Sequence, residues 1–299
     1  MERWNQIFIA SHKSFFIVFG IFGNVNLVYI ILTTPRLRNK SSYLQALQST
    51  AHIFCILNSF IDVYLMLSDS RIPRDLCFYL IAPTTFCFCF QTAIMLFILL
   101  DMLFAVLFPF ALRGIDDWKY VLAMSLAPGL WGAGMVIWSS QNLDDTLLTL
   151  CAPPTTLHRE AYEVLFPVTV IINTLSLVVF VALLVTFRKK VKTNIDCSRV
   201  MKHLRVSAAV FIGSIYFSIF GANLVMLLGV TGDAYTFMIG NLSINAMFSY
   251  SHTFYTIIWR SSEYRKRFLG MYYKNAGAQV SNPPSHAKKR SLVVSEHQC

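Results

Sequence analysis

Long apolar segments recur along the chain, each bounded by charged or turn-forming residues. A helix needs roughly 20 predominantly apolar residues to cross the ~30 Å hydrocarbon core of a bilayer. The pattern therefore predicts an all-α membrane protein, a bundle of seven transmembrane helices. The predicted spans are residues 15–34, 43–67, 77–108, 119–138, 161–187, 204–229 and 234–259.

The first apolar segment follows Arg3 and Lys13, as the apolar core of a cleavable signal peptide would. It continues through Gly23 and Asn24 as far as Leu32, which is too long for such a core, and basic residues follow it. We therefore interpret it as the first transmembrane helix. The predicted organisation is an extracellular N-terminus (1–14), the bundle (15–259), a short amphipathic eighth helix (260–273) and a disordered cytoplasmic tail (274–299).

Composition agrees with a membrane protein. Hydrophobic residues make up 56% of the chain and charged residues only 13%, about half the charged share of an ordinary soluble domain. The formal net charge of +10 does not indicate nucleic-acid binding, because the basic residues lie in short clusters between apolar segments. Cytoplasmic loops are rich in Lys and Arg, and 20 of the 25 such residues become cytoplasmic if the N-terminus is outside. We therefore expect a multi-pass plasma-membrane protein with an extracellular N-terminus and a cytoplasmic C-terminus.

The seven cysteines lack the paired short spacings of zinc sites, so neither a metal site nor a cofactor is expected. Cys77 begins the third predicted span at its extracellular end, and Cys151 lies in the long loop between the fourth and fifth spans, on the same oxidising side. A disulfide between them would hold this loop over the mouth of the bundle. Two free thiols are the alternative.

Polar residues in the second span recur at helical spacing and predict a face turned into the bundle. Hydrogen bonding between helices is one role for them. Asp62 lies about 15 Å above His52 by helical rise, near the extracellular mouth, and either a contact with a cationic or hydrogen-bonding ligand or a structural role fits it. The stripe consists of Gln45, Gln48, Ser49, His52, Ser59 and Asp62.

Asp101 stands at the cytoplasmic end of the third span, where a lone carboxylate needs a partner or a raised pKa. Lys202 and Arg205, at the start of the sixth span, are candidate partners. We expect an ion pair between Asp101 and one of them in the resting state.

Taken together, these features resemble rhodopsin-like G-protein-coupled receptors from Gly23 to Phe268. The segment Gly23-Asn24 matches the first-helix signature, and Asp101, Ala105 and Pro109 match the third-helix motif, with Cys77 at the disulfide position. Pro167 resembles the fifth-helix proline, and the segment from Ser251 to Tyr255 stands where the family has Asn-Pro-x-x-Tyr. Several positions depart from the family pattern, including Met102 for the arginine, Leu103 for the tyrosine, His52 for the sodium-binding aspartate and His252 for the seventh-helix proline.

The departures from the rhodopsin-like pattern are most similar to the residues of serpentine receptor class SX, a family of nematode chemoreceptors. The matching segments are Lys40-Ser-Ser-Tyr43-Leu-Gln45, Ala51-His52, Asp101 to Pro109, and Trp259 to Arg265. The resemblance implies a receptor for environmental chemicals or an endogenous ligand such as a peptide, displayed on sensory neurons and their cilia. It also implies a heterotrimeric G protein as partner.

On this interpretation the protein is not an enzyme, and a ligand shifts the population of helix arrangements. The expected ligand-binding residues are Asp62, Thr84, Gln91, Asn223, Asn241 and Asn245. The expected activation and G-protein-coupling residues are Asp101, Arg113, Lys202, Arg205 and Tyr255, and the expected bundle core contains Asn24, His52, Ser251 and His252.

Two alternatives remain open at this stage. A seven-helix transporter or channel is favoured by the polar stripe and by His52 and His252, which could relay protons. Against it, the sequence shows neither an inverted repeat nor helices broken at matching positions. A nonsignalling membrane escort is conceivable because the arginine of the third-helix motif is absent.

Overall fold

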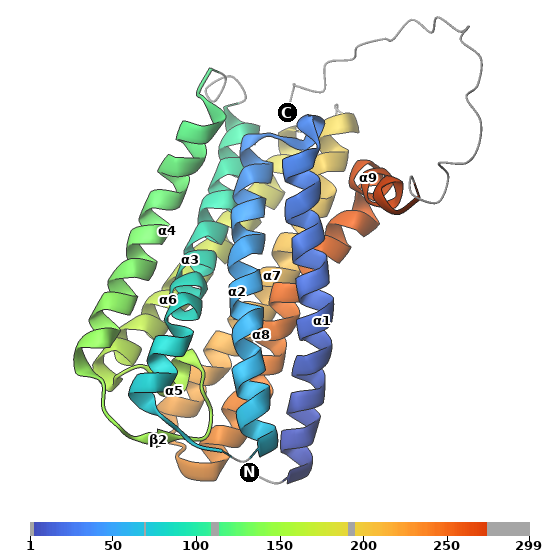
Figure 1. Cartoon of the computed structure of the whole chain (residues 1–299). Helices are drawn as coiled ribbons and strands as arrows, with labels where there is room; N and C mark the ends of the chain where they lie inside the picture. The colour runs from blue at the N-terminus through green and yellow to red at the C-terminus, as the bar shows by residue number, and fades with distance from the viewer. Residues whose placement is uncertain (1–2, 69, 109–113, 191–194, 274–299) are drawn as a thin grey trace, which may run out of the picture.

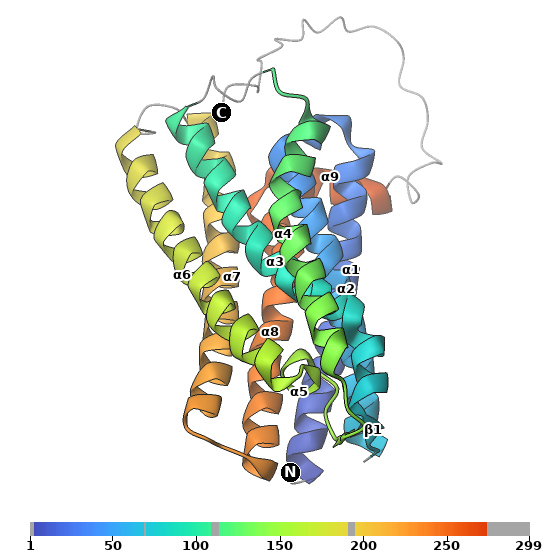
Figure 2. The same ribbon diagram turned by 90° about the vertical axis from the view of Figure 1, so that its left-hand side faces the viewer.

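The computed structural model describes residues 3–68, 70–108, 114–190 and 195–273. These residues form seven long helices that run side by side, as Figure 1 and Figure 2 show. The long helices are α1 (Arg3–Thr33), α2 (Lys40–Ser68), α3 (Arg74–Leu107), α4 (Asp117–Ser139), α6 (Arg159–Lys190), α7 (Ile195–Leu227) and α8 (Gly232–Arg260). The shorter elements are η1 (Pro35–Leu37), β1 (Ile72–Pro73), η2 (Ser140–Asn142), β2 (Leu147–Leu148), α5 (Pro153–Thr156) and α9 (Ser262–Tyr273).

The long helices have the length and surface of membrane spans. Within the described ranges, five of them (α1 to α4 and α6) are long and apolar enough to cross a bilayer, and α7 adds the shorter apolar stretch Ile212–Leu227. Large apolar side chains are exposed around the bundle, for example Val18 at 73% and Leu130 at 65%. In a soluble protein such a surface would drive aggregation, whereas lipid accommodates it. The fold is the predicted seven-helix membrane bundle.

Helix α1 begins at Arg3, well before the apolar segment that predicts it. The guanidinium of Arg3 donates hydrogen bonds to the backbone oxygens of Met66, at 3.3 Å, and Leu67, at 3.0 Å. These carbonyls belong to the last turn of α2, which lacks intrahelical partners for them. The contact joins the two helix ends, and it extends α1 so that Lys13 lies inside the helix and is buried.

The turns between the helices have local causes. Asp116 caps α4 by accepting a hydrogen bond from the backbone N–H of Trp118 at 3.0 Å. Gly229 and Gly232 have φ values of 63° and 65°, in the left-handed region that glycine adopts without strain. They bracket the turn that reverses the chain between α7 and α8.

Helix α9 leaves the bundle at the end opposite to the N-terminus (Figure 1). The ring of Phe268 packs edge-on against Phe254 of α8, with ring centroids 5.2 Å apart, and against Phe22 of α1 at 6.3 Å. The exposed side of α9 carries Arg265, Lys266 and Arg267. An apolar side on the bundle and a basic side toward water suit a helix that lies along an anionic membrane surface. The predicted tail, 274–299, lies outside the described residues.

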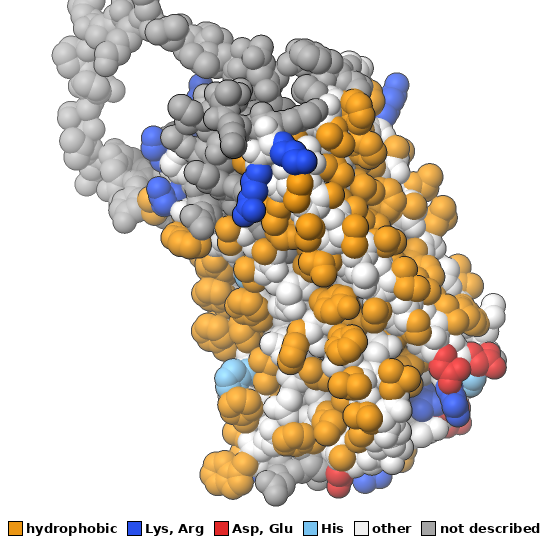
Figure 3. All heavy atoms as spheres, turned by 180° about the vertical axis from the view of Figure 1, so that it is seen from behind, with side chains coloured by type: hydrophobic (Ala, Val, Ile, Leu, Met, Phe, Trp, Pro, Cys, Tyr) orange, Lys and Arg blue, Asp and Glu red, His pale blue; other side chains and the backbone are white. Residues whose placement is uncertain are grey.

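Charge is distributed unevenly between the two ends of the bundle. Figure 3 shows one face, on which apolar side chains cover the middle, Lys and Arg lie near one end, and Asp and Glu are seen at the other end together with further Lys and Arg side chains. A charge-poor middle between two polar ends is the distribution that a bilayer imposes.

Candidate functional site

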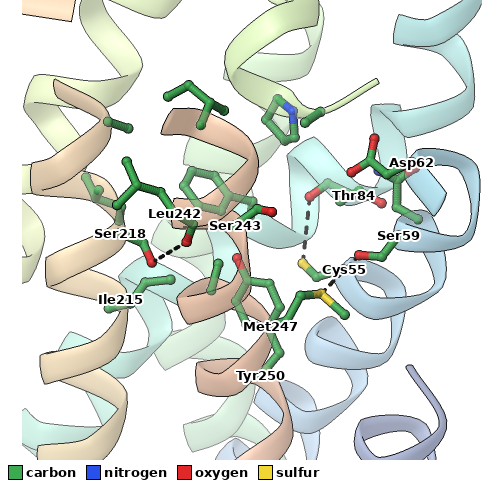
Figure 4. A pocket seen from close by; sticks show the side chains of 18 of the residues that line it. Cys55, Ser59, Asp62, Thr84, Ile215, Ser218, Leu242, Ser243, Met247 and Tyr250 are labelled. Carbon is green, nitrogen blue, oxygen red and sulfur yellow. Dashed lines mark hydrogen bonds between the residues drawn. The ribbon is translucent and has the colours of Figure 1, made fainter. Parts of the chain in front are cut away.

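A cavity of about 120 Å³ lies between the helices in the half of the bundle that contains the two-stranded β1–β2 sheet. Residues of α1, α2, α3, α6, α7 and α8 line it, and so do loop residues just before α5. Figure 4 shows the side chains that converge on it. Its apolar lining includes Phe88, Phe166, Ile215, Ile219, Leu242 and Met247. Apolar walls with a few placed polar groups are typical of a small-molecule site.

The loop between α4 and α6, hereafter the roof loop, covers the cavity. Cys151 forms the predicted disulfide with Cys77 of α3, 74 residues earlier in the chain. Its neighbours Leu150, Ala152 and Pro153 line the cavity. The disulfide therefore fixes the residues that cover the cavity to the start of α3.

A second attachment holds the outer part of this loop. Pro73 and Leu147 are paired in the antiparallel ladder of β1 and β2, and Arg74 forms an ion pair with Asp144. The pKa of Asp144 is held below its usual value, chiefly by a hydrogen bond from Thr146 and also by the charge of Arg74. The carboxylate thus keeps its charge, and hence its contact with Arg74, throughout the physiological pH range.

Asp62 does line the cavity, but it already has a cationic partner. Lys13 Nζ donates to Asp62 Oδ2 at 2.9 Å, and the two side chains are only 2% and 6% exposed. The backbone amide of Cys151 lies against the same carboxylate. The pair joins α1, α2 and the roof of the cavity. Sequence reasoning missed Lys13, because it lies before the first apolar segment and was assigned to the extracellular N-terminus.

Asn58 is a second lining residue that the sequence-based prediction missed. It lies one helical turn before Asp62 on α2 and is 9% exposed. Within the described chain its side-chain oxygen has no hydrogen-bond partner. Its spacing of four residues from Asp62 places both side chains on one face, and that spacing was the signal available in the sequence.

The other predicted ligand-binding residues are dispersed. Thr84 lines the cavity and donates a hydrogen bond to the carbonyl of Phe54 at 3.3 Å. Gln91 is fully buried near Tyr250, deeper in the bundle. Of the remaining three, Asn223 and Asn241 donate to backbone carbonyls of their own helices at 2.8 Å, and none of Asn223, Asn241 and Asn245 is among the lining residues.

The residues predicted for the bundle core lie between the cavity and the end of the bundle that carries α9. The amide of Asn24 on α1 donates to the carbonyl of Tyr250 on α8 at 2.8 Å. A Cβ atom at Gly20 would come within 2.5 Å of Ser251 Oγ, so α1 and α8 approach closely there. All four residues predicted for the core (Asn24, His52, Ser251 and His252) are buried.

At the opposite end of the bundle, Asp101 is held by two neutral hydroxyl groups. Tyr120 of α4 donates to Asp101 Oδ1 at 2.6 Å, and Ser41 of α2 donates to Oδ2 at 2.5 Å. Hydrogen bonds to a charged acceptor are the stronger kind. Asp101 therefore ties together α2, α3 and α4. The side chains of Lys202 and Arg205 lie outside the described residues, as does Arg113, so the ion pair expected from the sequence stays a hypothesis.

Tyr255 faces α1. Its ring stacks on Phe19 with centroids 3.7 Å apart, and its hydroxyl donates to the carbonyl of Phe19 at 2.7 Å. These contacts add to the close packing of α1 on α8.

A known protein family matches most of the chain. The family model described as "Serpentine type 7TM GPCR chemoreceptor Srsx" matches residues 17–272. The match runs from the middle of α1 through α9. No curated protein matches the chain.

Proposed function

Since the chain belongs to the Srsx family of serpentine seven-transmembrane G-protein-coupled chemoreceptors, we propose that a ligand in the cavity activates it and that it signals to a heterotrimeric G protein. The single observation that carries the ligand site is the roofed cavity between six of the seven helices. Its volume suits a small molecule better than a peptide.

The contacts across the cavity suggest how binding reaches the other end. Ser218 of α7 donates to the carbonyl of Leu242 on α8 at 3.1 Å, and both residues line the cavity (Figure 4). A ligand that fits one relative position of α7 and α8 better than another shifts the population toward it, by as much as its two affinities differ. The far ends of these helices then move relative to α3, where Asp101 lies.

The proposed orientation places the cavity outside and α9 inside. It is supported by the Lys and Arg residues, 20 of 25 of which then fall on the cytoplasmic side. It is also supported by the disulfide beside the cavity, since disulfides persist in oxidising compartments. The G protein would bind the cytoplasmic ends of α3, α6 and α7, bordered by Arg113, Lys202 and Arg205.

A substitution that fills the cavity tests this function. Ala246→Phe places a ring in the cavity, and the control Leu130→Phe places a ring on the exposed side of α4. Cells that express each variant with a promiscuous G-protein α-subunit are screened against small-molecule and peptide libraries. We expect the response to an active ligand to be lost in Ala246→Phe and kept in Leu130→Phe, at equal surface expression. An unchanged response in Ala246→Phe would place the ligand elsewhere.

A further inference from the structure

The charges that face the cavity cancel. Among the described residues that line it, only Lys13 and Asp62 are charged, and they pair at 2.9 Å. A ligand with a net charge would be buried beside a pair that is already matched and would find no counter-ion. Burying such an ion without a counter-ion is strongly unfavourable. The cavity therefore selects against ammonium and carboxylate ligands.

The serine hydroxyls in the lining already donate their hydrogens within the protein. Ser218 donates to Leu242, Ser243 donates to the carbonyl of Gly240 at 2.6 Å, and Ser59 contacts the sulfur of Met247 at 3.0 Å. They offer a ligand lone pairs, but a hydrogen only if an existing bond breaks. Most of the remaining lining is apolar.

Two buried side-chain oxygens at the cavity lack a hydrogen-bond partner in the described part of the chain, Oδ1 of Asn58 and Oδ1 of Asp62. The charge of Asp62 is already matched by Lys13 through its other oxygen, so Asn58 is the neutral group with an unused acceptor. An unsatisfied buried acceptor is costly, and a ligand that supplies the missing donor recovers that cost. A primary amide side chain both donates and accepts, so its best partner does the same.

We infer that the cavity binds an uncharged, largely apolar molecule with a hydroxyl or primary amide group, which hydrogen-bonds to Asn58. This inference rests on the proposed function in one respect, namely that the cavity is the ligand site. It defines the ligand by chemistry, as an apolar body of small size with one neutral group that is both donor and acceptor.

Binding is measured on the purified full-length protein in lipid nanodiscs, as ligand-induced thermal stabilisation. The probes are four alkyl series of graded length, with an alcohol, primary amide, ammonium or carboxylate end. We expect saturable stabilisation by alcohols and amides of suitable length, and none by their charged counterparts. Asn58→Ala should weaken the apparent affinity about tenfold, as the loss of one buried hydrogen bond predicts.

Two further variants make the test specific. Asn173→Ala is the matched control, because Asn173 is also a buried asparagine, but it lies on α6, donates a hydrogen bond to its own helix and does not line the cavity. It should leave the affinity unchanged. Asn58→Asp places an unmatched carboxylate in the cavity, so it should admit the alkylammonium probes that wild type rejects.

Stabilisation of wild type by a charged probe as strong as that by its alcohol would overturn the inference. So would an affinity that Asn58→Ala leaves unchanged, or the absence of any uncharged probe that stabilises the protein at millimolar concentration. The assay does not require a G protein. Selective binding without signalling would uphold the inference and refute the proposed function. Signalling in response to a charged ligand would uphold the proposed function and refute the inference.

Discussion

At the residue scale, the pair of Lys13 and Asp62 supplies the charged groups among the described residues that line the cavity, and it joins α1 to α2. Replacing Lys13 by Met leaves a buried carboxylate without its partner, which costs about 3–5 kcal/mol in comparable cases. We therefore expect Lys13→Met to lower the melting temperature in detergent markedly. The double variant Lys13→Met/Asp62→Leu should recover most of the loss, because it leaves no unpaired charge.

The matched control for that comparison is Lys119→Met, which removes an exposed lysine on α4. It should change the melting temperature little, since exposed charges contribute little to stability. If Lys13→Met were as stable as Lys119→Met, the buried pair would not hold the two helices together.

Asp101 is the second residue whose environment bears on function. Tyr120→Phe removes one of its two hydroxyl partners, and hydrogen bonds to charged groups contribute about 1.5–3 kcal/mol. Because these bonds tie α3 to α2 and α4, we expect Tyr120→Phe to loosen the end where the G protein is proposed to bind and to raise basal signalling.

The measurement is ligand-independent G-protein activation, normalised to surface expression. Tyr29→Phe, an exposed tyrosine on α1, serves as control and should behave as wild type. Equal basal activity in Tyr120→Phe and Tyr29→Phe would show that the hydroxyl contact does not restrain the receptor.

At the scale of elements, the roof loop is the part whose position depends on a covalent link. The disulfide closes a loop over a sequence separation of 74, for which the loop-entropy relation gives a stabilisation of about 4.5 kcal/mol. Without it, Leu150 and Ala152 are no longer held over the cavity. We expect the double variant Cys77→Ser/Cys151→Ser to reach the surface less efficiently and to bind ligand more weakly, with faster dissociation.

Cys87→Ala is the control for thiol loss, because Cys87 lies in α3 and is free. Ligand dissociation is followed on purified receptor. A double variant that retains the wild-type dissociation rate would mean that the loop does not cover the bound ligand.

At the scale of the whole molecule, the uneven charge fixes the proposed orientation in the membrane. An epitope tag before Arg3 should be labelled by antibody in intact cells, and a tag after Cys299 only once the cells are permeabilised. The reason is that basic segments are retained in the cytoplasm. Labelling of the C-terminal tag in intact cells would contradict this orientation.

The seven helices and the disulfide were predicted from the sequence. Helix length and the apolar segments are local properties, because every backbone hydrogen bond inside a span must be made within that span. The pairing of Cys77 with Cys151 followed from the two being expected on the same oxidising side. The start of α1 was not predictable, because the contact of Arg3 with the end of α2 joins positions more than sixty residues apart.

The sequence by itself determined the membrane bundle, its polar helix faces and the family resemblance, because these depend on the order of residues along one helix at a time. Only the tertiary structure decided the partners of the buried polar groups. It paired Asp62 with Lys13, gave Asp101 the hydroxyls of Tyr120 and Ser41, and left the side-chain oxygen of Asn58 at the cavity without a partner among the described residues. The physical reason is that such partners depend on how neighbouring helices are rotated and shifted relative to one another, and periodicity along a single helix specifies neither.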